Sequence, residues 1–296
     1  MSTPASQRPR TFPPWLRRRW PVPSENAVVR NTLDALTLNT VCAGAQCPNQ
    51  GECWQRGTAT FMILGRVCTR KCPFCGVPSG TPETPDPEEP ARIAEAVRRL
   101  GLRHVVVTTV TRDDLPDGGA AQLVAVTEQV RSRCPDATIE LLTSDFGGAA
   151  DAVQRVAAAN PDVFAHNIET VARLHPLLRD PRACYERSLS VLELARETLK
   201  PSCHVKSGFM VGCGETDPEI QDTLRDLHNA GCDAVTIGQY LKPAGGHVDV
   251  QSFVPPEQFD RYEQMARDTG FAFVMAGPFV RSSYHAEELT EEQRAG

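Results

Sequence analysis

Six of the eleven cysteines fall in one stretch, and their spacing suits metal ligation. They form two triplets, the first at Cys42, Cys47 and Cys53 and the second at Cys68, Cys72 and Cys75. In a reducing compartment, cysteines packed this densely are metal ligands more often than disulfide partners. A tetrahedral zinc site or an iron–sulfur cluster ligated only by protein needs four ligands, whereas each triplet supplies three. Because both triplets supply three ligands, we expect sites in which one iron is left open or is bound by a group other than cysteine.

The second triplet has the spacing C-x3-C-x2-C, and an aromatic residue, Phe74, immediately precedes its last cysteine. It follows an apolar run at 60–64 that predicts a buried strand. A fourth thiolate would block an iron that has to hold a cofactor, so three ligands suit a catalytic cluster. A zinc knuckle that borrows a distant ligand is the alternative, but zinc sites usually consist of two C-x2-C pairs. Beside this triplet, the first one indicates an auxiliary cluster rather than scattered core cysteines.

The length, composition and charge of the chain limit the classes of protein to which it can belong. A chain of 296 residues with 41% hydrophobic content can bury a substantial core, either in one α/β barrel or in two smaller domains. The net charge of -6 disfavours nucleic acid as a partner, because phosphate binding needs a basic surface. No apolar run reaches about 18 residues, so we expect no membrane-spanning helix and no membrane partner.

An arginine-rich arm opens the chain, with Arg8, Arg10, Arg17, Arg18 and Arg19. No apolar run follows these arginines, and prolines interrupt any helix, so the segment is predicted to be a mature arm and not a signal peptide. It is either solvated or docked on an acidic partner. We therefore expect a cytoplasmic protein.

Beyond residue 60, short apolar runs alternate with amphipathic helical patterns. Predicted strands lie at 60–67, 104–109, 138–142, 162–165, 204–211 and 234–237. Predicted helices lie at 28–38, 91–100, 120–133, 149–159, 186–198, 218–230 and 256–269. Six strand–helix units imply a parallel sheet with right-handed crossovers. Around the first triplet, turn-forming residues such as Asn49 and Gly51 predict a loop.

Polar residues follow several of these strands directly. They are Arg112 to Asp114, Ser144 and Asp145, His166, Asn167 and Glu169, and Gln239 and Tyr240. The C-terminal face of a parallel barrel is where such residues build an active site, and the second cysteine triplet would open on the same face. We therefore predict a partial (β/α)6 TIM-type barrel in preference to a doubly wound sheet. The predicted divisions are an N-terminal extension at 1–56, the barrel at 57–277 and a C-terminal tail at 278–296, with both extensions covering the barrel mouth.

Motifs from about residue 10 to Ala286 carry a resemblance to a known family. They are Cys42-x4-Cys47-Pro-Asn-x-x-Glu-Cys53-Trp, Gly57-Thr-Ala-Thr-Phe-Met-Ile-Leu-Gly65, Cys68-Thr-Arg-Lys-Cys-Pro-Phe-Cys75, Arg112-Asp-Asp-Leu-Pro-Asp-Gly-Gly119, His166-Asn-Ile-Glu-Thr170, Lys206-Ser-Gly-Phe-Met-Val-Gly212 and Gly277-Pro-Phe-Val-Arg-Ser-Ser-Tyr284. Each is modest evidence, but their order along one chain is specific. Together they make the chain resemble the lipoyl synthases, which are radical S-adenosylmethionine sulfurtransferases.

The resemblance implies insertion of two sulfur atoms, at C6 and C8 of a protein-bound N6-octanoyl-lysine. It implies two 4Fe-4S clusters. The one on Cys68, Cys72 and Cys75 would bind S-adenosylmethionine and generate a 5'-deoxyadenosyl radical. The auxiliary one on Cys42, Cys47 and Cys53 would give up its own sulfide. Its fourth ligand would be a serine of the Arg-Ser-Ser-Tyr motif, Ser282 or Ser283, of which we favour Ser283.

The resemblance also implies partners. These are octanoylated lipoyl carrier domains, of the glycine-cleavage H protein or of 2-oxoacid dehydrogenases, a flavodoxin- or ferredoxin-type reductant, and a carrier that supplies clusters. Phe74, Asn167 and Glu169 would contact the cofactor, although Asn167 and Glu169 would equally suit supporting hydrogen bonds.

Several polar residues have two interpretations. Asp113 and Asp114 either help to close the site or cap the following helix. Lys206 and Arg182 meet a carboxylate of a ligand or form ordinary salt bridges. His285 is expected to face solvent. The five remaining cysteines, Cys134, Cys184, Cys203, Cys213 and Cys232, show no ligand spacing and are interpreted as small core or surface residues.

Two other functions compete with this one. A radical S-adenosylmethionine enzyme that inserts sulfur into a free small molecule, as biotin synthase does, would lack the first triplet and the Arg-Ser-Ser-Tyr motif. A non-catalytic iron–sulfur electron carrier, or a zinc-stabilised binding module, would leave the barrel pattern without a purpose.

Overall fold

The computed structural model describes residues 12–17, 27–44, 47, 49–55, 60–243 and 247–290. Four arginines of the predicted arm (Arg8, Arg10, Arg18 and Arg19), the motif residues 57–59 and the end of the tail at 291–296 lie outside these ranges. No helix among the described residues combines the length and the apolar character that a bilayer span requires.

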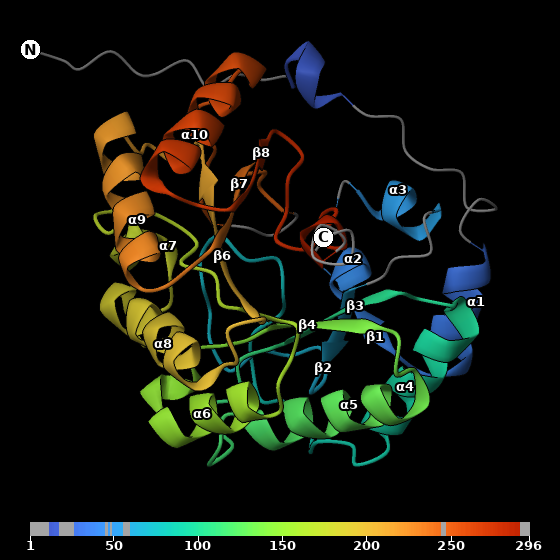
Figure 1. Ribbon diagram of the computed structural model, residues 1–296. Helices are drawn as coiled ribbons and strands as arrows, with labels where there is room; N and C mark the ends of the chain where they lie inside the picture. Colours follow the sequence, from blue (N-terminus) through green and yellow to red (C-terminus); the bar gives the residue numbers. More distant parts are fainter. Residues whose placement is uncertain are drawn as a thin grey trace, which may run out of the picture.

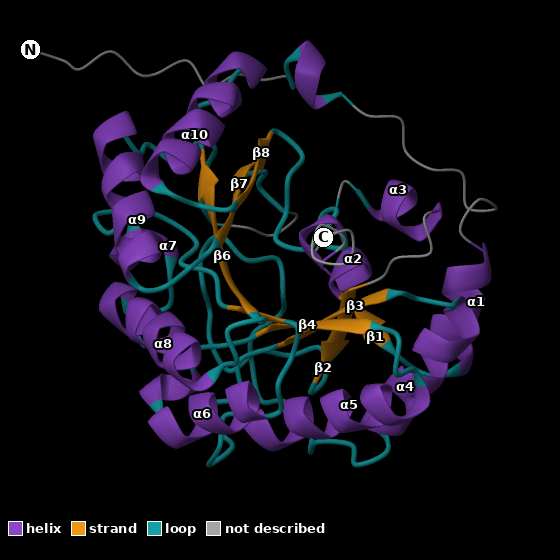
Figure 2. Cartoon of the chain, viewed as in Figure 1, coloured by secondary structure: helices purple, strands orange, loops and turns teal. Residues whose placement is uncertain are grey.

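One eight-stranded sheet runs through the described residues, and its strands are ordered as in the sequence. The strands are β1 Asn39–Thr40, β2 Thr60–Ile63, β3 His104–Thr109, β4 Thr138–Leu142, β5 Val163–Ala165, β6 His204–Val211, β7 Ala234–Gln239 and β8 Phe273–Gly277. β2 to β8 are parallel, and β1 pairs antiparallel with β2. The sheet curves into an open barrel, with α4 to α10 on its outer side and α2 near the C-terminal segment (Figures 1 and 2). The predicted fold class is confirmed.

The helices alternate with the strands. They are α1 Ala27–Ala35, α2 Val41–Gly44, α3 Gln50–Gln55, α4 Glu89–Leu100, α5 Ala120–Arg133, α6 Ala150–Ala158, α7 His175–Leu178, α8 Tyr185–Thr198, α9 Asp217–Asn229 and α10 Pro256–Thr269. Clear end signals explain why the long helices match their predicted ranges closely. α9 is preceded by Thr216, which forms a capping box with Glu219, and α4 is followed by its C-cap Gly101, whose φ of 62° suits glycine.

The structure differs from the sequence prediction in several places, among them the end of α1, which is Ala35 and not residue 38, and the short helix α7, which was not predicted. The loop predicted around the first triplet is wrong, because α2 and α3 form there; Cys42 and Trp54 are buried, and their packing overrides the local turn signals. β2 ends at Ile63 and not at residue 67, since Leu64 and Gly65 have φ values of 65° and 95° that end the extended backbone. β1 and β8 were not predicted, and β1 is too short to show a pattern.

The C-terminal segment turns back from β8 into the space enclosed by the sheet (Figure 1). There Leu289 packs against Val163 and Ala234, at the first residues of β5 and β7. Gly238 is needed for this path, because a Cβ at that position would lie 2.2 Å from the backbone oxygen of Val280. The tail therefore contributes to the inside of the barrel.

A buried ion pair joins β4 and β6. Lys206 Nζ lies 3.0 Å from both carboxylate oxygens of Glu140, and the two side chains are 1% and 0% exposed. Burial opposes the charge on Glu140, but the nearby ammonium of Lys206 and the ring of His104 outweigh it and lower the pKa of the carboxyl. Of the two interpretations of Lys206, the salt bridge is the one observed.

Replacing Lys206 by methionine should leave the negative charge of Glu140 buried without its partner. Breaking a buried pair in this way costs about 3–5 kcal/mol of unfolding free energy, measurable by urea denaturation. The double variant Lys206→Met, Glu140→Gln should recover most of that loss, because no unpaired charge remains. A single variant within about 1 kcal/mol of the parent would contradict this account.

Candidate active site

The first cysteine triplet lies in a small cavity where the N-terminal helices meet the C-terminal tail. Its lining consists of Cys42, Cys47, Asn49, Cys53, Thr60, Arg281, Ser283 and Tyr284. α2 carries Cys42, α3 carries Cys53 and β2 begins with Thr60, while Ser283 arrives from the tail. Three thiols of the N-terminal segment and the hydroxyl of Ser283 from the distant tail are thus brought together.

The thiols of this cavity are poorly suited to carry charge without a cation. Burial raises the pKa of Cys42, and burial together with the neighbouring Cys42 and Cys47 raises the pKa of Cys53 to about 12. A metal centre removes this penalty, because its positive charge stabilises the thiolates that bind it. The donor set, three thiols and a hydroxyl, fits a cubane cluster with one oxygen ligand.

Two neighbouring serines of the tail point in different directions. Thr60 Oγ1 donates a hydrogen bond to Ser283 Oγ at 2.8 Å, on the side of the first triplet. Asn167 Nδ2 donates to Ser282 Oγ at 2.6 Å, beyond the end of β5. The structure therefore distinguishes the two serines that the sequence left as alternatives, and only Ser283 lines the cavity of the first triplet.

The tail is fastened to the N-terminal segment by side chains. Tyr284 donates its hydroxyl to Glu52 Oε1 at 2.9 Å, and His285 Nε2 lies 3.2 Å from the same oxygen. Asn49 Nδ2 donates to the backbone oxygen of Phe279 at 2.6 Å. The expectation that His285 faces solvent is wrong, because it is half-buried against α3.

The second triplet lies in the loop that follows β2, and each of its sulfurs accepts one backbone hydrogen bond. Cys68 Sγ accepts from the N–H of Arg70 at 3.4 Å, and Cys75 Sγ accepts from Val77 at 3.4 Å. Cys72 Sγ accepts from the distant Asp180 at 3.3 Å. Hydrogen bonds to sulfur favour the thiolate form and adjust the potential of a bound cluster.

Charged residues surround the second triplet. Burial raises the pKa of Cys75 to about 11 and also raises that of Cys72, which the guanidinium of Arg179 opposes. Arg179 Nη1 lies 3.8 Å from Glu169 Oε1, and the Asn167 amide donates to the same oxygen at 3.3 Å. Burial raises the pKa of Glu169, again against Arg179. Asn167 and Glu169 are therefore brought together beside Cys72, as the sequence predicted for the strand end.

Glu169 has a φ of 71°, which is strained for a residue with a side chain. Two backbone hydrogen bonds to β6 hold it there, from its N–H to the oxygen of Gly208 at 3.0 Å and from Met210 to its own oxygen at 2.9 Å. Strain that the surroundings enforce is common at functional sites.

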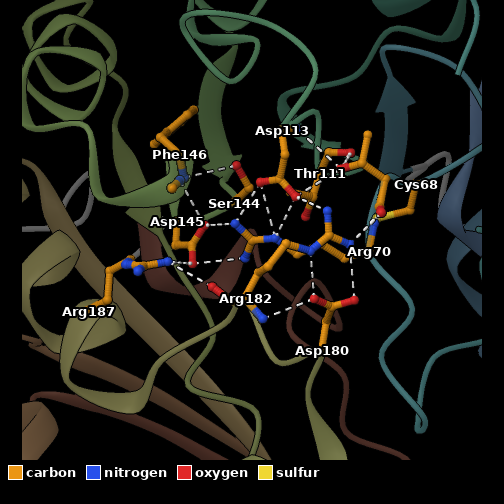
Figure 3. Close-up of polar contacts among 12 residues, drawn as sticks. Cys68, Arg70, Thr111, Asp113, Ser144, Asp145, Phe146, Asp180, Arg182 and Arg187 are labelled. Carbon is orange, nitrogen blue, oxygen red and sulfur yellow. Dashed lines mark hydrogen bonds and ion pairs between the residues drawn. The ribbon is translucent and has the colours of Figure 1, made fainter. Parts of the chain in front are cut away.

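An arginine within the cysteine loop ties the loop to the neighbouring strand ends (Figure 3). Arg70 lies between two cysteines and pairs with Asp113 after β3 and with Asp145 after β4, each at 2.7 Å. Burial opposes the charge on Asp145, but Arg70 outweighs it and lowers the pKa of the carboxyl to about 2. Beside this network, and lined in part by Arg70 and Asp113, a cavity of about 470 Å3 opens between the strand ends and residues 181–187.

Neither Asp113 nor Asp114 caps the following helix. Asp114 forms a two-pronged hydrogen bond with Arg112, and the carboxylate that accepts from the first turn of α5 is that of Asp117, from the N–H of Ala121 at 2.8 Å. The capping interpretation is therefore wrong, and Asp113 instead secures the cysteine loop.

Other predicted polar residues have structural roles. His166 is buried between Thr143 and Ser188, and burial lowers its pKa to about 4. Among the described residues, the Gln239 side chain hydrogen-bonds to backbone groups, and Tyr240 donates to the oxygen of Val248. Phe74 is half-buried and packs against the core. None of the eleven cysteines, all within the described residues, forms a disulfide, and those outside the triplets are buried or half-buried.

Sequence reasoning missed Arg179 and Arg70 as site residues. The sequence could have indicated Arg70, since it lies inside the C-x3-C spacing of the second triplet. No sequence pattern indicates Arg179, because it follows the short helix α7 and is brought to the cysteine loop only by the fold.

The second triplet and its surroundings fit an iron–sulfur cluster with a bound amino acid group. Arg179 is nearly buried, and its Nε has no hydrogen-bond partner among the described residues, so it is available to an anion such as a carboxylate. No three His, Cys, Asp or Glu side chains in the described part of the chain have the geometry to hold a single metal ion. A cluster differs, because its ligands bind several irons.

Comparisons with known proteins agree with this geometry. The model of the Radical SAM superfamily matches residues 62–227. A lipoyl synthase from Rubrobacter xylanophilus is 51% identical over 284 residues, which are 96% of this chain and 88% of that protein. A lipoyl synthase from Pyrobaculum calidifontis is 53% identical over 280 residues, 94% of this chain and 95% of that protein.

Solved structures show the same fold at low identity. Streptococcus suis SuiB bound to precursor peptide SuiA superposes with a TM-score of 0.56 at 12% identity, over 81% of this chain and 54% of that one, so this chain spans about half of its length. Methylornithine synthase (PylB) gives a TM-score of 0.50 at 13% identity, over 83% of this chain and 81% of that one.

Iron and sulfide analysis tests the assignment of the two triplets. After anaerobic reconstitution we expect about eight irons and eight sulfides per chain, and about four of each in Cys53→Ala or Cys75→Ala, because each variant opens one site. Cys134→Ala, outside both triplets, should keep all eight. Full occupancy in both triplet variants would refute the assignment, as would zinc in place of iron.

Proposed function

Because the chain belongs to the lipoyl synthases of the radical S-adenosylmethionine superfamily, we propose that its two cysteine triplets hold the two 4Fe-4S clusters of that reaction. The protein is a radical sulfurtransferase that inserts sulfur at C6 and C8 of a protein-bound N6-octanoyl-lysine. The observation that carries the proposal is the placement of Ser283 in one cavity with Cys42, Cys47 and Cys53. A sulfur inserter without the first triplet, or a simple electron carrier, does not explain that cavity.

Bound S-adenosylmethionine supplies a 5'-deoxyadenosyl radical, which is reactive enough to take hydrogen from an unactivated carbon. The chain's own residues hold and orient the cofactor. Cys68, Cys72 and Cys75 supply three thiolates and leave one position open. Arg179 offers a cation to the carboxylate of the cofactor, because its Nε is buried without a partner in the described structure. Glu169 and Asn167 offer acceptors for its polar groups.

Ser283 supplies the weaker ligand of the auxiliary site. A hydroxyl oxygen binds iron less strongly than a thiolate does. The iron held by serine should therefore be released first when the cluster gives up sulfide. Thr60 orients this oxygen through its 2.8 Å hydrogen bond. Ser282, which contacts Asn167, belongs to the other side of the tail.

Adjacent serines bring the two sites within reach of one substrate chain. Ser283 lines the auxiliary cavity, while Ser282 contacts Asn167, which in turn contacts Glu169 beside Cys72. The tail thus lies between the two sites, and an octanoyl chain entering beside it would meet the radical on one side and the sulfur source on the other. Both target carbons can be served from one position, since they are two bonds apart.

The enzyme acts on lipoyl carrier proteins. Within the proposal, these are the octanoylated glycine-cleavage H protein or the lipoyl domains of 2-oxoacid dehydrogenases. A flavodoxin- or ferredoxin-type protein supplies the electron, and a cluster-assembly carrier restores the auxiliary site. The cytoplasm suits eleven cysteines without disulfides. Residues 1–56 and 278–296 provide the auxiliary ligands, and residues 57–277 provide the barrel.

Mass spectrometry of the product tests the function directly. An octanoylated lysine peptide incubated with the reduced, reconstituted protein and S-adenosylmethionine should gain two sulfur atoms, and 5'-deoxyadenosine should form. Cys75→Ala should give neither product, since it lacks a ligand of the radical site. Formation of 5'-deoxyadenosine without any sulfur insertion into this peptide would contradict the assigned substrate.

The two serines can be separated by substitution. Ser283→Cys should keep about eight irons per chain but lose product by at least about 100-fold, because a thiolate holds the iron that must be released. Ser282→Cys should keep a larger share of the activity, since its side chain faces Asn167. If the two results were exchanged, the ligand would be Ser282.

A further inference from the structure

A short segment after α7 clamps the loop of the second triplet from outside. This clamp segment, Arg179–Arg182, lies 108 residues from Cys72 in the sequence, and the N–H of its Asp180 donates to Cys72 Sγ at 3.3 Å. The carboxylate of Asp180 accepts from the N–H of Lys71 at 2.8 Å. One residue therefore contacts both a cysteine sulfur and the backbone next to it.

Arg182 fastens the clamp segment to the cysteine loop (Figure 3). Its Nε lies 2.9 Å and its Nη2 3.1 Å from the two oxygens of Asp180. Its Nη2 also donates to the backbone oxygen of Thr69 at 2.6 Å, and its Nη1 donates to Asp113 at 3.1 Å. The guanidinium thus joins the carboxylate of Asp180 to the loop whose sulfur Asp180 contacts.

The hydrogen bond to Cys72 differs in origin from those to the other two sulfurs. Cys68 and Cys75 accept from residues two positions later, so their hydrogen bonds come with the shape of the loop itself. The donor to Cys72 belongs to another part of the fold. Its position depends on the contacts that hold the clamp segment, and Arg182 makes several of them.

We propose that Arg182 is a positioning residue that keeps the N–H of Asp180 on the Cys72 sulfur and thereby raises the reduction potential of the radical-generating cluster. The proposal rests on the proposed function, in which Cys68, Cys72 and Cys75 hold that cluster. Accepting one electron makes the cluster more negative, and an N–H dipole directed at a ligand sulfur stabilises the more negative form. Arg179, in the same segment, adds a positive charge near Cys72.

Arg182 suits an experiment because it is not part of the core. Its side chain is 52% exposed, so its ion pairs contribute little to the stability of the fold. Arg173 provides a matched control: it is 54% exposed, forms a two-pronged pair with Glu219 and donates to the backbone oxygen of Gly214. It does not contact the cysteine loop in the described structure.

Redox titration of Arg182→Gln, followed by electron paramagnetic resonance, tests the proposal. The signal of interest is the one that changes on addition of S-adenosylmethionine, which separates the radical-generating cluster from the auxiliary one. We expect the equilibrium constant for one-electron reduction to fall about tenfold, equivalent to a shift of about 59 mV to more negative potential. Iron content and the unfolding transition should match the parent, Arg173→Gln should keep the parent potential, and Arg182→Lys should give an intermediate shift.

An unchanged potential in Arg182→Gln with full iron content would overturn the proposal while leaving the proposed function intact. Loss of iron from this variant would also overturn it, because the clamp segment would then be retaining the cluster instead of adjusting its potential. If the parent protein itself showed no signal that responds to S-adenosylmethionine, the proposed function would fail first.

Discussion

Buried thiols that lie side by side resist ionisation, and this constraint shapes both cysteine sites. In the first triplet, burial and the neighbouring thiols together raise the pKa of Cys53 to about 12. In the second, each sulfur receives a backbone N–H, and Arg179 adds a positive charge near Cys72. Backbone hydrogen bonds offset part of the cost of burial at both sites, since Cys42 accepts one from Thr60, and a bound metal centre would stabilise the thiolates further.

The barrel supplies the rigid frame for these contacts. The parallel strands place Asn167, Asp113 and Asp145 beyond their C-terminal ends, on the side of the barrel where the cysteine loop lies. The Lys206 and Glu140 side chains form a buried pair with each other in the same barrel. The residues of the candidate site thus lie at the C-terminal ends of the strands, whereas the stabilising ion pair lies within the strands, as in other barrels of this type.

Local sequence patterns predicted most of the fold, because they report local physics. The strand at 204–211 and the helix at 256–269 were predicted with the observed bounds, since their apolar periodicity and end signals are strong. The spacing of Cys68, Cys72 and Cys75 indicated a metal site for the same reason. Arg179, the N–H of Asp180 and the opposite directions of Ser282 and Ser283 were beyond such reasoning. Each depends on a contact between segments more than a hundred residues apart, and no local pattern records it.

The route of the tail into the barrel has a consequence for synthesis of the protein. Tyr284 and Glu52, whose hydrogen bond fastens the tail to α3, are 232 positions apart. A ribosome that adds about 5–20 residues per second therefore needs roughly tens of seconds to pass from one to the other. During that interval the nascent chain can display Cys42, Cys47 and Cys53 without the serine that completes their cavity. The cavity of the first triplet is accordingly completed only near the end of translation, although its three cysteines are made before those of the second triplet.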